Sequence, residues 1–189
     1  MKEKVMAVLK NKKLIGGVIA AIVAMIVIIL LLNVIFSSKP KKYEEKIKNV
    51  VKALSSESKM KDAIDDKLID IKGAAAWMEA DQEAEDFKKE YKDLKKDSDE
   101  IEEMEDGLKE LAKSNEELER EYKVKNIKEP KKDKDNKKIY SVTATLVTEG
   151  GYYDSEQQIK VIFYKGKVVD IISKDYDSSL FESAVKANK

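Results

Sequence analysis

The chain of 189 residues contains no His and no Cys, and its single Arg stands beside 36 Lys. These absences exclude a Ser-His-Asp triad, a Cys nucleophile, a disulfide, and metal sites built from imidazole or thiolate. General acid–base chemistry would have to use Asp, Glu, Lys or Tyr. We therefore expect no catalytic residue, no metal ion and no cofactor. An enzyme working only through carboxylate, lysine or tyrosine groups is the rival interpretation.

Charge is absent from one long stretch, Leu14–Phe36, in which Asn33 is the only strongly polar residue. A helix of this length spans roughly 34 Å, which matches a hydrocarbon core of about 30 Å. A buried core helix rarely stays free of charge for so long. A cleaved signal peptide is also disfavoured, because the following residues lack a small-x-small cleavage site. We predict an uncleaved transmembrane helix at residues 14–36.

Small residues recur on one face of this predicted helix. Gly16, Ala20 and Ala24 are spaced four apart, and this spacing allows two membrane helices to approach closely. The sequence therefore suggests a dimer face and a homo-oligomer formed through the membrane helix. The alternative is that Gly and Ala are simply common in membrane helices.

The formal net charge of zero hides an uneven distribution. Residues 1–13 hold five Lys and one Glu, whereas the chain after Phe36 holds 32 basic and 36 acidic residues. The two sides of the apolar stretch carry equal numbers of nearby lysines, so the positive-inside rule does not decide the orientation. Long C-terminal domains translocate largely regardless of charge, and a short basic tail stays inside. We predict a basic cytoplasmic tail at residues 1–13 and a single-pass cell-membrane protein with its C-terminal domain outside; the reverse orientation would make it a cytoplasmic-facing regulator.

The exported part divides by its apolar pattern. A linker at residues 37–42 contains Pro40, and residues 43–120 then show apolar positions at helical spacing. Ser55–Ser58 and Asp97–Glu100 interrupt this pattern, and Asp97 and Glu100 have the spacing of a capping box. We predict several helices that fold back on one another. The alternative is a coiled-coil stalk carrying a small β domain, which would act as a structural spacer, although charged residues at core heptad positions disfavour it.

Residues 121–175 alternate apolar and polar positions instead. Tyr140–Leu146 and Ile159–Tyr164 are strong strand patterns, and Lys165–Gly166 supplies a tight turn before Val168–Ser173. This order predicts an antiparallel β-meander, one face of which the preceding helices would cover. Residues 176–189 would form a short C-terminal helix and tail, and Ser179 and Glu182 have the spacing of a capping box at the start of that helix. The predicted fold class is α+β, a helical layer packed on a C-terminal antiparallel sheet.

The sheet half carries a resemblance. The segments YKVKNIKEP, IYSVTATLVTEGG and QQIKVIFYKGKVVDII, read in this order after a helical region, resemble the NTF2-like (cystatin-like) α+β fold. The resemblance covers roughly residues 43–175 and implies a membrane-anchored extracytoplasmic domain of the kind found in Gram-positive bacteria. Proteins of the VirB8 type, components of transfer or secretion machineries, share the layout of short tail, anchor and NTF2-like domain. That likeness is architectural, and it carries over no functional residue.

Two groups of aromatic residues are candidate contact sites. Trp77, Tyr91, Tyr140 and Phe163 would line a concave pocket between helices and sheet, although core packing is the simpler explanation for them. Tyr152-Tyr153, beside two glycines, would form an exposed recognition turn or an ordinary hairpin tip.

A polar loop at residues 128–138 carries six lysines against three acidic residues. Such a loop suits anionic lipid, a wall polymer or nucleic acid, and the lack of interleaved aromatics argues against nucleic acid. Taken together, the sequence predicts a non-enzymatic binding or scaffolding module. Its expected partners are the lipid bilayer and another envelope protein or wall component.

Overall fold

The computed structural model describes residues 41–152 and 154–188. The predicted tail, the predicted transmembrane helix with Gly16, Ala20 and Ala24, and most of the linker therefore lie outside the described residues. Within residues 41–152 and 154–188, no helix is both long enough and apolar enough to cross a membrane.

Among the described residues, five helices precede the sheet and one follows it. The first, at residues 41–53, turns its apolar side chains inward, and Ile47, Val50 and Val51 are at most 1% exposed. This burial is what the spacing of those residues predicts. The remaining helices are α2 (Glu57–Asp65), α3 (Ile71–Glu79), α4 (Phe87–Asp93), α5 (Asp99–Glu117) and α6 (Leu180–Ala187).

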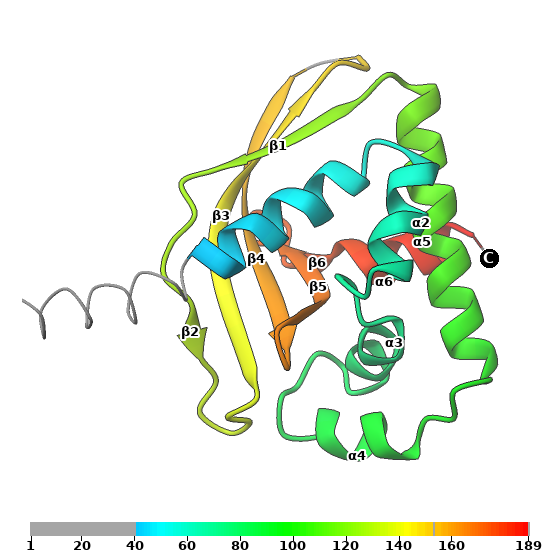
Figure 1. Cartoon of the computed structure of the whole chain (residues 1–189), viewed down its shortest axis with the longest axis vertical. Coiled ribbons are helices and arrows are strands. Elements are labelled where there is room, and N and C mark those ends of the chain that lie inside the picture. Colours follow the sequence, from blue (N-terminus) through cyan, green and yellow to red (C-terminus); the bar gives the residue numbers. More distant parts are fainter. Residues whose placement is uncertain (1–40, 153, 189) are drawn as a thin grey trace, which may run out of the picture. The chain divides into compact units, whose positions relative to one another are not determined.

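The sheet is antiparallel throughout and runs in the order β1-β3-β4-β5-β6, with β2 pairing on the same side of β3 as β1. Figure 1 shows β1 and β2 following one another along this edge. The strands are β1 (Glu121–Lys125), β2 (Lys131–Lys132), β3 (Ile139–Glu149), β4 (Ser155–Tyr164), β5 (Lys167–Ser173) and β6 (Ser178–Ser179).

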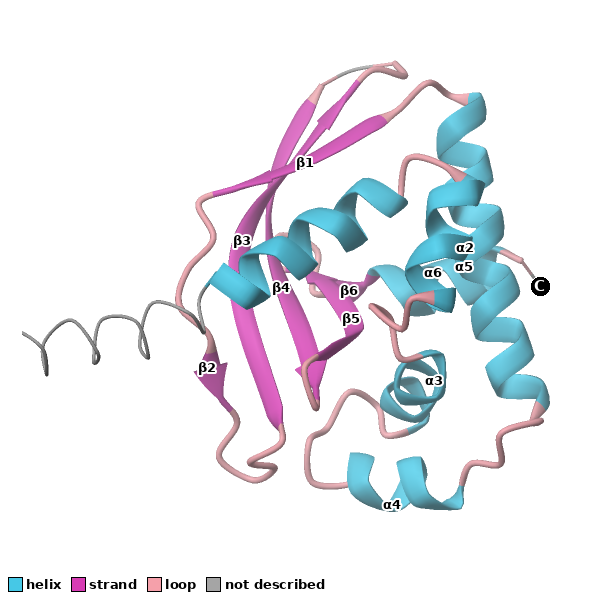
Figure 2. Ribbon diagram, in the orientation of Figure 1, coloured by secondary structure: helices cyan, strands magenta, loops and turns pink. Residues whose placement is uncertain are grey.

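Most of the helices cover one face of the sheet, as Figure 2 shows for the helix at residues 41–53 crossing β3 and β4. Register places Val142 opposite Val161 and Ala144 opposite Ile159, and all four side chains belong to the main core. The main core also takes side chains from α2, α5 and α6. On the other face, the register pairs Thr143 with Lys160, which is exposed.

A second apolar cluster occupies one end of that other face. Its strand residues include Ile139, Ile162 and Tyr164, and its helical residues include Trp77 and Phe87 from α3 and α4. The α3–α4 segment thus covers the end of the sheet where β3 begins and β4 finishes. This second cluster forms the base of the candidate site.

The helical pattern has breaks that local signals did not predict. Gly73, a residue type that weakens helices, lies inside α3. Residues 66–70, between α2 and α3, are not helical. The cause is a tertiary pairing, because Asp70 N–H donates to the carbonyl of Val168 (2.9 Å) and Val168 N–H donates to that of Leu68 (2.9 Å).

The two predicted helix caps had opposite outcomes. The capping box at Asp97 and Glu100 is wrong, because α5 begins at Asp99 after Ser98, whose side chain makes no cap bond. The cap at Ser179 is confirmed, since its hydroxyl accepts the N–H of Glu182 at 3.0 Å.

The predicted fold class is confirmed in its coarse form, as helices packed on an antiparallel sheet. The coiled-coil stalk is wrong for the described residues. The longest helix among the described residues, α5, is 19 residues long and packs against α2, α3 and α6 rather than extending away.

Candidate functional site

A hollow of about 620 Å³ opens where α4 meets the loop before β3 and the β4–β5 turn. Its wall is rich in lysine and has two tyrosine rings. The lining residues are Lys72, Ala84, Glu85, Lys88, Tyr91, Lys92, Asp135, Asn136, Lys137, Lys138, Tyr164 and Lys165. We call it the lysine-rich hollow.

Helix α4 presents one side to this hollow and buries the other. Lys88, Tyr91 and Lys92 follow helical i, i+3, i+4 spacing and therefore share a face. Phe87 is fully buried, with its ring centroid 5.6 Å from that of Trp77 and 4.8 Å from that of Tyr164. The Phe87 contacts hold a helix of only seven residues in place, and this placement positions the two lysines.

Tyr91 and Tyr164 stand side by side in the wall, with ring centroids 4.9 Å apart. The Tyr91 hydroxyl donates to Asp70 Oδ2 at 3.4 Å. Burial first, then the charge of Asp70 and the neighbouring Tyr164, raise the pKa of Tyr91 to about 12. The Tyr91 phenol is therefore neutral at physiological pH.

Two lysines lie over these rings. Lys165 Nζ is 4.8 Å from the Tyr164 centroid and 5.5 Å from that of Tyr91, and Lys72 Nζ is 5.1 Å from that of Tyr91. Cation–π attraction of this kind stabilises an ammonium group without neutralising it. Lys72 Nζ also donates a hydrogen bond to the carbonyl of Leu94 at 2.5 Å, and this bond links α3 to the C-terminal end of α4.

The loop before β3 is ordered by local hydrogen bonds. Asp133 Oδ1 accepts the backbone N–H of Asp135 (2.9 Å) and of Asn136 (2.8 Å), which is an Asx turn. Lys165 N–H then donates to the carbonyl of Lys138 at 3.2 Å, tying the loop to the β4–β5 turn. Lys137 and Lys138 are thereby held at the mouth of the hollow.

The hollow has a strong positive excess. Six lysines line it against two carboxylates, Glu85 and Asp135. Within the described residues, no ion pair joins any of the six to a carboxylate. Their charge is therefore available to an anionic ligand.

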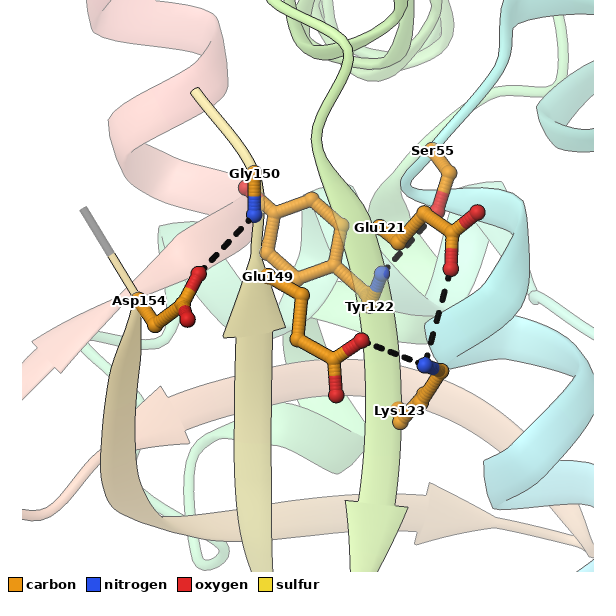
Figure 3. Close-up of polar contacts among 7 residues, drawn as sticks. All are labelled: Ser55, Glu121, Tyr122, Lys123, Glu149, Gly150 and Asp154. Atoms are coloured by element: carbon orange, nitrogen blue, oxygen red, sulfur yellow. Dashed lines mark hydrogen bonds and ion pairs between the residues drawn. The ribbon is translucent and has the colours of Figure 1, made fainter. Parts of the chain in front are cut away.

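Lysines at the opposite end of the sheet behave differently. Figure 3 shows Lys123 between two glutamates, with Nζ 2.5 Å from Glu149 Oε2 and 3.6 Å from Glu121 Oε2. Lys125 forms an ion pair with Glu156. A smaller hollow of about 340 Å³ lies beside β1, where Tyr122 N–H donates to Ser55 Oγ at 3.2 Å. Four lysines line it, and two of them, Lys48 and Lys123, already form ion pairs with glutamates. This hollow therefore offers fewer unpaired lysines to an anion than the lysine-rich hollow does.

The four predicted pocket residues do not line a single cavity. Trp77 and Tyr91 both contact Phe87 in the second apolar cluster, whereas Tyr140 and Phe163 both contact the ring of Tyr43 on the helix-covered face. Of the four, only Tyr91 lines the lysine-rich hollow, and Trp77 supports it from beneath.

The predicted exposed turn is partly described. Tyr152 is 84% exposed, and Tyr153 lies outside the described residues. This turn lies at the far end of the sheet from the hollow.

Sequence reasoning found part of the site. The basic loop at residues 128–138 supplies Lys137 and Lys138, and Tyr91 was a predicted contact residue. It missed Lys72, Lys165 and the α4 lysines, which come from three separate segments. The spacing of Lys88, Tyr91 and Lys92 was a usable signal, because it places two cations and a ring on one helical face.

Comparison of the chain with known proteins identifies no family. No protein-family model, no curated protein and no solved structure matches the chain. The site is therefore assessed by its own chemistry. In the part of the chain that the structure describes, no group of three or more acidic residues is placed to hold a metal ion.

Proposed function

We propose that the chain is a single-pass, membrane-anchored envelope protein whose exported α+β domain is a non-enzymatic binding module. The lysine-rich hollow would be its binding site, and the ligand an anionic group on another envelope component. The observation that carries this proposal is the set of six lysines in one cavity, none of which forms an ion pair with a carboxylate in the part of the chain that the structure describes.

The composition of the hollow favours binding over catalysis. Tyr91 is held as a neutral phenol, with its pKa raised to about 12, and Lys165 Nζ lies over the rings of Tyr91 and Tyr164. Ammonium groups with three donors each attract phosphate or carboxylate as point charges. Anchoring at the membrane would raise the effective concentration of the module near its partner.

The remaining parts of the proposal rest on the sequence. The transmembrane helix at residues 14–36, the outside location of the domain, the anchor dimer face and the NTF2-like ancestry stay predictions. The partner would be another envelope protein or a wall component.

A binding experiment tests the function. The purified full-length chain in neutral detergent is titrated with inorganic polyphosphate, beside a Lys137→Gln/Lys138→Gln double variant. The control is Lys160→Gln/Lys174→Gln, two exposed lysines away from the hollow. We expect the hollow variant to bind about tenfold more weakly at moderate salt, since each exposed ion pair contributes up to about 1 kcal/mol.

Two results would contradict the proposal. One is equal weakening by both double variants, which would mean that polyphosphate follows net charge alone. The other is an absence of any measurable binding at low ionic strength, where screening is weakest.

A further inference from the structure

We propose that the lysine-rich hollow binds the phosphate groups of anionic lipids in the same membrane that anchors the chain. This inference rests on the proposed function, and it names the ligand class and the orientation of the domain. The argument uses the place where the chain enters the domain, the length of the linker and the charge at the two ends of the sheet.

The start of the domain lies at the same end of the sheet as the hollow. The ring of Tyr43 packs 4.8 Å from that of Phe163, and Lys46 Nζ donates to the carbonyl of Gly166. Gly166 belongs to the β4–β5 turn, and the preceding residue, Lys165, lines the hollow. The residues nearest the predicted anchor therefore contact the turn that forms one wall of the site.

The linker is too short to hold this end far from the bilayer. Residues 37–42 span at most about 20 Å when fully extended. Strand β3 has 11 residues, so its two ends are separated by roughly 35 Å. If residues 14–36 cross the membrane, the first turn of the helix at residues 41–53 must stay near the headgroups. The β4–β5 turn stays there with it.

The charge of the domain favours the same orientation. Burial lowers the pKa of Lys46, which lies beside the hollow, and the charges of the nearby Lys42 and Lys167 lower it further. These lysines extend the positive region around the chain's point of entry into the domain. An anionic membrane surface attracts such a region within about one Debye length.

The β3–β4 hairpin, at the opposite end of the sheet, lacks this positive excess. The β3–β4 hairpin carries Glu149, Asp154 and Glu156, and the neighbouring lysines Lys123 and Lys125 are taken up in ion pairs. Figure 3 shows this neutralised end, where Asp154 also accepts the N–H of Gly150 at 3.1 Å. An anionic surface would therefore favour the hollow end over the hairpin end.

The side chains of the hollow suit lipid phosphates better than a stacked or bidentate ligand. All six cations are lysines, which accept phosphate from many directions, whereas the one Arg of the chain lies at the other end and contacts Asn115 (3.4 Å). Both tyrosine rings are engaged with each other and capped by Lys165, so no open ring is offered to a base. Tyrosine is also common where a protein meets the headgroup layer.

The test measures lysine accessibility in the full-length chain. The protein is inserted into nanodiscs of phosphatidylcholine alone, or of phosphatidylcholine with phosphatidylglycerol, and exposed to an amine-reactive reagent. Mass spectrometry then gives a labelling rate for each lysine. We expect Lys137, Lys138 and Lys165 to react several-fold more slowly in the anionic discs. The rate for Lys174 should not change, and high salt should abolish the difference.

A third arm separates this inference from the proposed function. Inorganic polyphosphate is added to the chain in neutral discs, and labelling is repeated. Protection by polyphosphate without protection in anionic discs would overturn the lipid proposal and leave the binding function standing. Protection by neither ligand would overturn both. Equal protection of Lys174 in anionic discs would also overturn the lipid proposal, because it would show a general charge effect.

Discussion

Asp170 is the one buried carboxyl group within the described residues, and it lies on β5 with only 1% of its surface exposed. Its Oδ1 accepts the Ser179 hydroxyl and the Ile171 N–H, both at 2.7 Å. Asp170 Oδ2 and Trp77 Nε1 each lack a partner of normal hydrogen-bond geometry. The Trp77 indole nevertheless favours the charged carboxylate and so lowers the pKa of Asp170. Burial outweighs these contacts and raises the pKa of Asp170 to about 6.

This raised pKa predicts a pH-dependent stability. Because the folded state holds the Asp170 proton more tightly than the unfolded state, the free energy of unfolding falls as pH rises. The loss is about 3 kcal/mol between roughly pH 4 and pH 7, with most of it below the folded pKa. We expect Asp170→Asn to remove this part of the slope. Denaturant unfolding of both chains across this range measures it.

The matched control for this prediction is Asp62→Asn, because Asp62 is exposed. Its unfolding curve should follow that of the unmodified chain at every pH. Parallel curves for Asp170→Asn and the unmodified chain would show that the buried carboxyl does not titrate in this range.

At the scale of elements, the packing of α5 on α6 depends on one residue without a side chain. A Cβ placed on Gly107 would lie 3.1 Å from backbone atoms of Ala184 and from the Cα of Val185. Backbone atoms yield less readily than the end of a flexible side chain. The glycine therefore sets how closely the last helix can approach the helical layer.

We accordingly expect Gly107→Ala to destabilise the fold by about 1 kcal/mol, even though alanine is intrinsically the better helix former by a similar amount. Gly107→Val should cost more. Thermal or denaturant unfolding measures both effects, and Ser114→Ala, at an exposed position of the same helix, is the control. A Gly107→Ala chain more stable than the original would mean that helix propensity outweighs the close contact.

For the whole molecule, the central prediction is the side of the membrane on which the domain lies. The chain has no Cys, so an introduced one is the only thiol. Lys134→Cys, in the exposed loop before β3, should react with a membrane-impermeant maleimide in intact cells stripped of their wall. Lys10→Cys, in the predicted cytoplasmic tail, should react only after lysis. The reverse result would place the domain inside and contradict both the envelope function and its orientation.

Much of the fold was accessible from local pattern. Alternation at Tyr140–Leu146 and Ile159–Tyr164 predicted the central strands, because a strand with one buried face must alternate. The cap at Ser179 also follows from nearest neighbours. The break at residues 66–70 could not be predicted, because it depends on pairing with Val168, about 100 residues away. The same holds for the lysine-rich hollow, whose lysines share no local motif apart from those of α4.

The sequence by itself determined what depends on composition and short-range spacing. It excluded His and Cys chemistry, separated a helical half from a β half, and predicted the uncharged stretch Leu14–Phe36 as a membrane anchor. Only the tertiary structure decided which lysines act together. Lys72, Lys138 and Lys165 come from separate segments, and chain folding alone places them in the wall of the same hollow. Coulombic attraction depends on distance in space, so a charge site can form from residues that are far apart in the sequence.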